Sequence, residues 1–196
     1  RRRNIVAQRA LRIGPNDTCA SVLSRVDEAS AELLVEQLPA LIAGVRLPRS
    51  EPCGPAAPRL PARTPDMGLI DWASPARMVH DWVRGLTLPF SGAFTTLGRR
   101  RVMVWATRWP SPREPVGAPG EVIGFDRGGV RVGVQNGSLV VSRRAYPGNP
   151  PAPAGLWCRV SGVDIGTRFD LASADRVAWT RGEGWETSRH DTRSVS

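Results

Sequence analysis

The sequence predicts an α+β fold, in which a strand–helix unit precedes an open β-barrel of five or six strands with one leading helix. Three observations support this prediction. Apolar side chains recur at helical spacing before residue 44, a proline-rich segment follows, and the apolar periodicity changes to two beyond Pro89. Several short strands after one helix are typical of a small barrel.

The N-terminal unit is expected to contain one strand and one helix. Residues 4–13 are predicted to form a short strand and its exit, which Gly14 ends. Residues 16–18 are all common helix caps, and the helix that they precede is expected to stop at Gly44. Pro39 is expected to kink or divide that helix.

A proline recurs at every third or fourth position between residues 45 and 67, which disfavours both helix and central strand. We therefore divide the chain into a strand–helix unit over 1–44, an extended linker over 45–67 and a barrel domain over 68–171. The polar residues 172–196 are expected to form a disordered tail.

The barrel domain is expected to open with a helix that ends near Leu86. Ser74 is its predicted cap and Pro75 its first helical residue. Asn136-Gly137 is a strong hairpin signal between two of the strands. The predicted strands are 93–97, 101–108, 121–126, 130–134, 138–145 and 156–163.

The charge balance of the 196 residues points to an anionic ligand. The formal net charge is +9, all 27 basic residues are arginine, and most of the excess lies within residues 68–171. Guanidinium groups pair with phosphate through two hydrogen bonds at once. A GC-rich genome is the simpler explanation of the arginines, and a polyanion partner such as nucleic acid, or another anionic ligand, is the alternative.

Two arginine clusters are the candidate polyanion-binding residues. Arg99, Arg100 and Arg101 lie at a predicted hairpin turn, and Arg143 and Arg144 lie near the end of a later strand. Hairpin turns and strand ends can gather at one rim of a small barrel, so the two clusters are expected to share a surface. Solvated turn charges are the alternative.

No catalytic or metal-binding constellation stands out. Cys19, Cys53 and Cys158 are far apart and lack metal-ligand spacing, so they are expected to be free thiols in a reducing cytoplasm. His80 borders the apolar face of the predicted helix and is expected to be structural, whereas His190 lies in the tail. No apolar run approaches the length of a membrane span, so we expect a cytoplasmic protein without a membrane partner.

Several segments resemble one family. Gly-Leu-Ile-Asp-Trp at 68–72, Pro-Ala at 75–76 and Val-Arg-Gly-Leu at 83–86 are similar to the start of the C-terminal domain of the methionyl-tRNA formyltransferase family. Pro-Phe-Ser-Gly-Ala-Phe-Thr at 89–95 and Pro-Gly-Glu-Val-Ile at 119–123 resemble the stretches that follow it. The resemblance implies that the barrel is OB-like.

The resemblance extends upstream, over about Asn4 to Leu171. Ile-Val-Ala-Gln at 5–8, Ile-Gly-Pro at 13–15 and Asp17-Thr18 are similar to the last strand and last helix of the family's N-terminal domain. It implies that residues 1–44 are the C-terminal remnant of a Rossmann-like catalytic domain.

The resemblance also implies the chemistry of the complete enzyme, which transfers a formyl group from 10-formyltetrahydrofolate to an amine. In the family an asparagine, a histidine and an aspartate deprotonate the amine and stabilise the oxyanion. The first two lie upstream of this sequence, and Arg1 aligns with the aspartate. Arginine cannot accept a proton there, so no catalytic residue carries over, and the chain alone is expected neither to bind the co-substrate nor to transfer formyl groups.

The acceptor amine distinguishes the members of the family. In the tRNA enzymes the barrel contacts the tRNA, and the loop after its first helix usually reads Asn-Pro-Trp-Pro. Here it reads Thr-Leu-Pro-Phe at 87–90, which is closer to relatives that formylate small amines such as aminosugar nucleotides or hydroxyornithine. We therefore favour a small amine as acceptor. A tRNA formyltransferase and a non-catalytic remnant are the alternatives.

Overall fold

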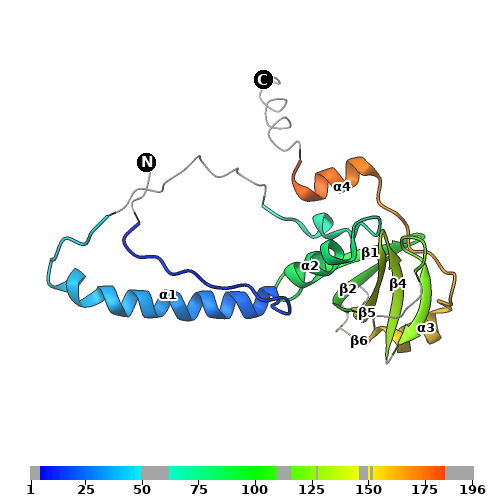
Figure 1. The fold of residues 1–196 in the computed structure, drawn as a ribbon, viewed down its shortest axis with the longest axis horizontal. Helices are drawn as coiled ribbons and strands as arrows, with labels where there is room; N and C mark the ends of the chain where they lie inside the picture. The colour runs from blue at the N-terminus through cyan, green and yellow to red at the C-terminus, as the bar shows by residue number, and fades with distance from the viewer. Residues whose placement is uncertain are drawn as a thin grey trace, which may run out of the picture. The chain divides into compact units, whose positions relative to one another are not determined.

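The structure is a computed structural model that describes residues 5–49, 62–109, 116–126, 128–145, 150 and 152–183. The chain divides into two compact units, Arg1–Arg59 and Leu60–Ser196. Figure 1 traces both units along the chain. The unit boundary falls within the expected linker, of which residues 50–61 lie outside the described part.

The first unit contains one long helix, α1 (Cys19–Ile42). The Thr18 side chain accepts a hydrogen bond from the Ser21 backbone N–H, and Ser21 Oγ accepts one from the Thr18 N–H. These reciprocal bonds satisfy backbone donors that a helix start otherwise leaves unpaired. The expected division at Pro39 does not occur, because that residue lies in the last turn, where little of the helix depends on it.

The strand expected over 4–13 is not formed. Ile5 makes an isolated bridge, and residues 6–14 have no regular secondary structure. Arg9 instead pairs with Glu32 and with Glu36 of α1, at 2.6 Å for the Glu36 carboxylate. A strand needs a neighbour to share its backbone hydrogen bonds, and the described part of this unit offers no second strand.

An antiparallel sheet forms the frame of the second unit, with strand order β1-β2-β5-β4-β3 and a short β6 paired to β5. The two-residue turn Gln135-Asn136 joins β4 to β5, which confirms the predicted hairpin. The strands are β1 (Ala93–Leu97), β2 (Arg100–Arg108), β3 (Val122–Asp126), β4 (Gly129–Val134), β5 (Gly137–Ala145) and β6 (Ala152–Pro153).

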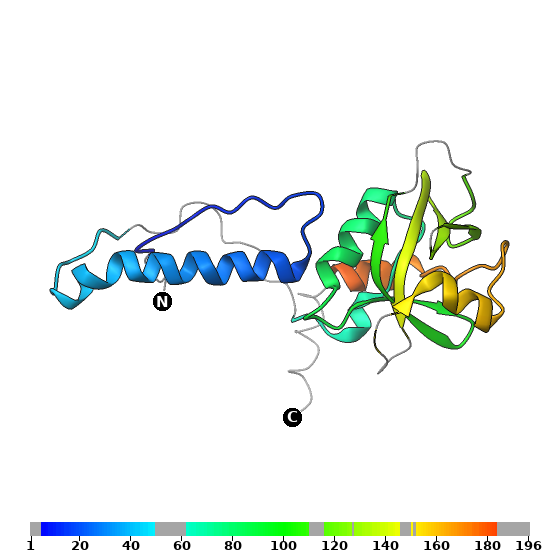
Figure 2. The ribbon, with the colours of Figure 1, turned by 90° about the horizontal axis from the view of Figure 1, so that it is seen from below.

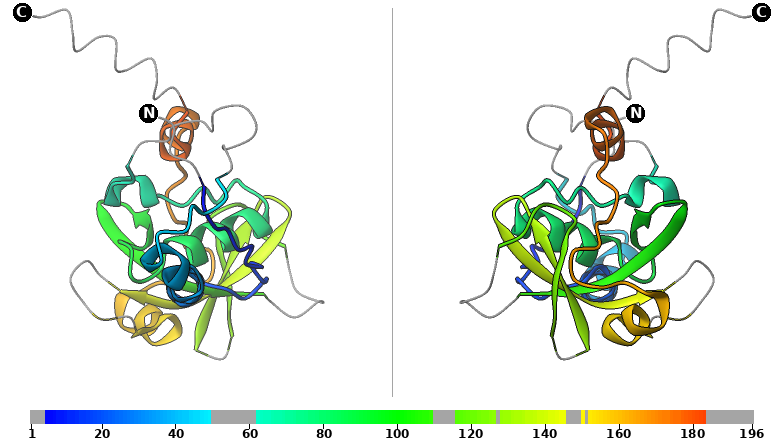
Figure 3. Two further views of the ribbon diagram at one scale, coloured as in Figure 1. Left: turned by 90° about the vertical axis from the view of Figure 1, so that its left-hand side faces the viewer. Right: turned by 90° about the vertical axis from the view of Figure 1, so that its right-hand side faces the viewer.

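The edge strands β1 and β3 do not pair with each other in the described residues, so the sheet is open. The segment around residues 169–170, further along the chain, touches both edges. Phe169 N–H donates to the Gly120 carbonyl oxygen at 2.9 Å, and Asp170 N–H donates to the Thr96 carbonyl oxygen at 2.9 Å. Figure 3 shows this segment running along the sheet toward the C-terminal helix.

Helix α2 (Ala76–Leu86) packs beside β2, as Figures 1 and 2 show, and buries Val79 and Val83. Its start differs from the expectation: the helix begins at Ala76, and Pro75 occupies the cap position. The side chain of Asn136 in the hairpin turn accepts the Ala76 N–H at 3.2 Å, so a residue 60 positions away supplies the cap that was expected from Ser74.

The strand expected over 156–163 is instead a helix, α3 (Ala154–Ser161), which packs against β4 and β5. Its buried residues Ala154, Trp157 and Cys158 follow helical spacing, at i, i+3 and i+4. Gly162 adopts a left-handed conformation with φ of 66° and ends the helix.

Two further elements form in segments that were expected to lack structure. A 3₁₀ turn, η1 (Pro65–Gly68), falls at the end of the expected linker and buries Met67. Helix α4 (Ala174–Arg181) falls in the expected disordered tail, with the Ser173 side chain accepting the Arg176 N–H at its start. α4 packs against η1. Residues 184–196 lie outside the described part.

Candidate functional site

The segment 68–74 holds the second unit together. Ile70 and Trp72 are fully buried, and Trp72 Nε1 donates to Thr95 Oγ1 of β1 at 2.9 Å. The Trp72 ring stacks on Phe169, which lies in the segment that touches both sheet edges, with 5.8 Å between ring centres. The Leu-Ile-Asp-Trp signature is therefore the packing centre of this unit.

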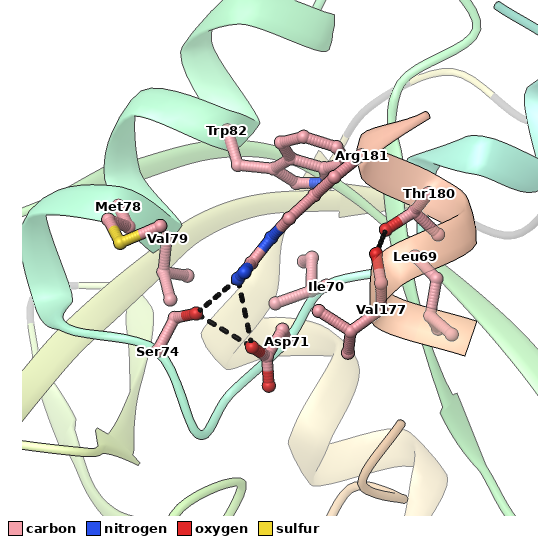
Figure 4. A pocket seen from close by; sticks show the side chains of 10 residues that line it. All are labelled: Leu69, Ile70, Asp71, Ser74, Met78, Val79, Trp82, Val177, Thr180 and Arg181. Atoms are coloured by element: carbon pink, nitrogen blue, oxygen red, sulfur yellow. Dashed lines mark hydrogen bonds and ion pairs between the residues drawn. The ribbon is translucent and has the colours of Figure 1, made fainter. Parts of the chain in front are cut away.

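Asp71 connects that segment to the C-terminal helix, as Figure 4 shows. Its Oδ2 accepts a hydrogen bond from Ser74 Oγ at 2.7 Å and lies 3.3 Å from Nη2 of Arg181 in α4. The adjoining cavity, between α2 and α4, measures about 40 Å³. This space suits a few water molecules and not a substrate, so the contacts of Figure 4 anchor α4.

His80 lies in a packed environment on α2. It is 7% exposed, its Nδ1 lies 2.9 Å from Thr107 Oγ1, and its ring tilts against Trp109 at 5.1 Å between ring centres. Its neighbour Asp81 faces Arg84 instead, at 2.6 Å. Burial and the contact with Thr107 are typical of a structural histidine.

The structure describes Cys19 and Cys158, and neither lies in a cluster of metal-binding side chains. Burial raises the pKa of the Cys158 thiol to about 11, and the thiol is nearly inaccessible. Cys19 is partly exposed in α1, whereas Cys53 and His190 lie outside the described residues. Within the described ranges no three His, Cys, Asp or Glu side chains gather as metal ligands would. Nor does any described helix combine the length and apolarity of a membrane span.

The first predicted arginine cluster lies at the β1–β2 turn. Arg99 and Arg100 are exposed, whereas Arg101 is held from two sides. Its Nη2 lies 2.5 Å from Asp66 Oδ1, and its guanidinium lies over the Phe94 ring, 3.8 Å from the ring centre. Arg101 is thus presented in one fixed orientation.

The second predicted cluster divides between the two sides of the sheet. Arg143 and Arg144 are neighbours in β5, and adjacent residues of a strand face opposite sides. Arg144 lies over the Trp157 ring of α3, 4.6 Å from its centre. Arg143 follows the side of Ala145, which pairs with Met103 of β2, and alternation places Arg101 on that same side. The register thus places Arg143, and not Arg144, on the side of Arg101.

An arginine from the C-terminal helix joins Arg101 instead. Arg176 Nη2 donates to the Asp66 carbonyl oxygen at 3.3 Å. We call Asp66, Arg101 and Arg176 the Asp66 cluster. The hydrogen bond and charge of Arg101, together with the charge of Arg176, lower the pKa of the Asp66 carboxyl, so Asp66 is ionised at neutral pH. Arg101 contacts the carboxylate and Arg176 the backbone oxygen of the same residue, so two guanidinium groups accompany one carboxylate and the cluster is positive.

The sequence did not single out Arg176, because residues 172–196 are polar and no helix was expected there. Ser173 is a good helix cap and Gly182 a good helix stop. These two flanking residues are the signals from which α4 could have been predicted.

A hollow of about 330 Å³ lies between η1, the end of α2 and the loop that precedes β1. Phe90, 51% exposed, and Arg63 lie on it, and we call it the Phe90 hollow. Gly68 and Gly92 form a close backbone contact in its wall, where a Cβ on Gly68 would fall 2.5 Å from the Gly92 carbonyl oxygen. The hollow is lined by Arg63, Thr64, Pro65, Met67, Gly68, Gly85, Leu86, Phe90, Ser91 and Gly92.

Comparison with known sequences identifies the family. The family described as "Formyl transferase, C-terminal domain" matches residues 63–161, from the wall of the Phe90 hollow to the end of α3. Methionyl-tRNA formyltransferase of Acidothermus cellulolyticus is 31% identical over 172 residues, which cover 81% of this chain and 52% of that protein. The Synechococcus enzyme of the same name is 32% identical over 174 residues, which cover 85% and 52%. The chain spans about half the length of these relatives.

Solved structures agree on the fold. HypX from Aquifex aeolicus in complex with tetrahydrofolic acid superimposes with a TM-score of 0.61 at 17% identity, over 97% of this chain and 38% of HypX. A variant of HypX superimposes with a TM-score of 0.60 at 21% identity, over 81% of this chain and 28% of that one. At these identities the likeness concerns the fold. Together with the sequence relatives, it shows that this chain belongs to the formyltransferase family and contains its C-terminal domain.

Proposed function

We propose that this chain is the C-terminal part of a formyltransferase that moves a formyl group from 10-formyltetrahydrofolate to an amine, and that its second unit binds the acceptor. The observation that carries the proposal is the arginine surface of a formyltransferase C-terminal domain. Arg99 and Arg100 are exposed at the β1–β2 turn, next to the fixed Arg101 and Arg176 of the Asp66 cluster.

The first candidate acceptor is tRNA. Relatives at 31–32% identity are named methionyl-tRNA formyltransferases. Arginines at a turn suit an RNA backbone, because phosphate contacts need no defined base sequence. Arg143 lies on the same side of the sheet as Arg101 and extends the proposed surface. Arg144 contacts Trp157, which favours a packing role for that residue.

The second candidate is a small amine, for which the loop at 87–90 argues. That loop departs from the tRNA enzymes' pattern, and its Phe90 opens onto a hollow large enough for part of a small molecule. An aminosugar nucleotide combines an amine with phosphates, so it fits both the hollow and the arginines.

The folate co-substrate is expected to bind elsewhere in the complete enzyme. HypX, which shares the fold, has been crystallised with tetrahydrofolic acid, and this supports a folate-dependent reaction. The described residues do not fit the formyl-transfer step, because His80 is buried against Thr107 and no base opens onto the Phe90 hollow. We therefore derive no catalytic step from this chain. A cytoplasmic enzyme without membrane partners is consistent with this proposal.

The salt dependence of tRNA binding tests the first candidate. For the full chain, the logarithm of the binding constant should fall linearly with the logarithm of salt concentration. Replacement of Arg99, Arg100 and Arg101 by serine should flatten that slope by about 0.9 per lost contact on duplex or about 0.7 on single strand. An unchanged slope would show that these arginines touch no phosphate and would favour the small-amine candidate.

A further inference from the structure

The β4–β5 turn carries the dipeptide Asn136-Gly137, and its asparagine also caps the start of helix α2. Asn136 is exposed, and its Oδ1 accepts the Ala76 N–H at 3.2 Å. We propose that Asn136 is a site of spontaneous deamidation, and that one of the two products keeps the cap of α2 while the other removes it. The inference concerns the chemical ageing of the chain and does not depend on the acceptor of the proposed reaction.

The residue after Asn136 permits ring closure. In deamidation the backbone nitrogen of the next residue attacks the side-chain carbonyl carbon of the asparagine, so that nitrogen must come close to the side chain. Glycine has no side chain to obstruct this approach, and its backbone is the least restricted. A Cβ placed on Gly137 would meet no heavy atom of the described residues within 4 Å, so open space lies beside it.

The reaction balances with water as its co-reactant. The Gly137 nitrogen loses its proton to solvent and forms a bond to Asn136 Cγ. The bond between Cγ and Nδ2 then breaks, and the amide nitrogen takes up a proton and leaves as ammonia. Water opens the resulting cyclic imide at either of its carbonyl carbons. Hydrolysis at Cγ gives aspartate with a normal backbone, and hydrolysis at the former backbone carbonyl gives isoaspartate.

The place of Gly137 in the sheet makes its nitrogen available. Val134 and Gly137 form the last pair of the β4–β5 ladder, directly beside the turn. Hydrogen bonds at the end of an element open locally at a much lower free-energy cost than global unfolding. The Asn136 side chain, being exposed, is in contact with water throughout. Deamidation should therefore proceed in the folded protein.

Two hydrogen bonds tie this turn to the start of α2. Besides the bond from Ala76, the Gln135 N–H donates to the Ser74 carbonyl oxygen at 3.3 Å. The first N–H groups of a helix have no acceptor within the helix, and Asn136 supplies one for Ala76. A chemical change at Asn136 is therefore a change at the cap of α2.

The two products leave different groups at that cap. Aspartate keeps a side-chain oxygen in place for the Ala76 N–H and adds a negative charge, which the N-terminus of a helix favours. Isoaspartate routes the main chain through the former side chain, so the turn gains one backbone atom and the carboxylate is attached directly to Cα. That product should lose the bond from Ala76 and disturb the adjoining pair of Val134 and Gly137.

Two other asparagines provide controls within the same chain. Asn16 is also exposed and lies in the turn before α1, but Asp17 follows it, and a side chain at that position obstructs the attacking nitrogen. Asn149 precedes Pro150, whose ring nitrogen carries no hydrogen and cannot form the imide. The three sites experience the same solution, so their rates compare directly.

The first test is incubation of the full chain at pH 8, with each asparagine followed by peptide mass spectrometry and isoaspartate identified by enzymatic methylation. Asn136 should deamidate at least about tenfold faster than Asn16, because only glycine leaves the nitrogen unobstructed. Asn149 should not deamidate. A rate at Asn136 no greater than that at Asn16 would overturn the inference.

Hydrogen exchange of the Ala76 amide and the rest of the first turn of α2 tests the effect of the products. Asn136→Asp, which supplies the aspartate product in pure form, should exchange within about twofold of the unchanged protein. The isoaspartate fraction of the aged protein should exchange at least about tenfold faster there, as should Asn136→Ala, which removes the cap. Thermal melts followed by circular dichroism confirm that each form is folded. Equal exchange in the aspartate and isoaspartate forms would overturn the assignment of different effects to the two products.

Discussion

The two units of this chain bury their apolar residues to very different extents. In the first unit Ala29 is the buried hydrophobic residue of α1, while Leu34, Val35 and Leu38 on the same helix are exposed. In the second unit the valines of β2, β4 and β5 are buried with Trp72 in one core. The described residues of the first unit offer no surface for the apolar stripe of α1 to pack against. The second unit, by contrast, buries its apolar residues against one another in its own core.

This contrast teaches that an apolar periodicity predicts an element but not its stability. A helix of the length of α1 is marginal in water unless its apolar face is buried. Its capping box and the ion pair between Arg25 and Asp17 support only its first turns. We therefore expect the fold of the first unit to depend on an apolar surface supplied from outside the described residues.

The largest expected effect comes from truncating one apolar side chain in each unit and comparing the losses in stability. Trp72→Ala should destabilise the second unit by about 4 kcal/mol, because it leaves a cavity and removes the bond to Thr95. Leu34→Ala in α1 should change stability by less than about 0.5 kcal/mol, because Leu34 is 59% exposed. Urea denaturation monitored by circular dichroism measures both, and equal losses would mean that α1 is packed as tightly as the sheet.

Thiol labelling sharpens the same contrast. At pH 8 the Cys158 thiol should react with iodoacetamide at least about tenfold more slowly than Cys19, because burial blocks access and raises its pKa to about 11. The measurement is peptide mass spectrometry in a Cys53→Ser background. In urea the two rates should converge. A fast Cys158 in native buffer would contradict the placement of α3 in the core.

A smaller effect is expected at the anchor of α4. Arg181→Ala removes the contacts to Asp71 and Ser74, a partly exposed ion pair worth no more than about 1 kcal/mol. Hydrogen exchange should speed up in α4 and stay unchanged in β4 and β5. Arg181→Lys, which keeps the charge, serves as the control. Unaltered exchange in α4 would show that other contacts hold the helix.

The smallest effect concerns the ionisation of Asp66. Its hydrogen bond from Arg101 lowers its pKa below 3.8, so its contribution to stability is present above the pKa of the unfolded chain and is lost as the pH falls through the lower folded value. An NMR titration should place the midpoint below 3.8 and move it upward in Arg101→Gln. A titration midpoint that is unchanged in Arg101→Gln would mean that the Arg101–Asp66 ion pair is not formed in solution.

Local sequence signals predicted the hairpin at Gln135-Asn136, the helix α2 and the positions of the five main strands almost to the residue. They failed for α3, where a dense apolar run fits a strand and a helix alike, and only the packing of Trp157 decides between them. Long-range partners, such as Asn136 capping α2, have no signal in one sequence.

The candidate site was predictable only in part. The turn position of Arg99 and Arg100 followed from periodicity, but the presence of Arg176 on the same Asp66 as Arg101 did not, because Arg176 lies 75 positions from Arg101 in a segment of ordinary polar composition. Phe90 stood out as a departure from a family pattern, yet the hollow beside it depends on the backbone contact between Gly68 and Gly92. Such a contact is a property of the fold and not of either segment.

Hydrogen–deuterium exchange on the full chain tests the contrast between the units most directly. Amides of β2, β4 and β5 should exchange only through global opening of the second unit, because their hydrogen bonds enclose its core. Amides of α1 should exchange within about tenfold of an unstructured peptide, because the described residues of its own unit leave its apolar face uncovered. Protection of α1 equal to that of β5 would contradict the account, since it would show that the apolar face of α1 is covered.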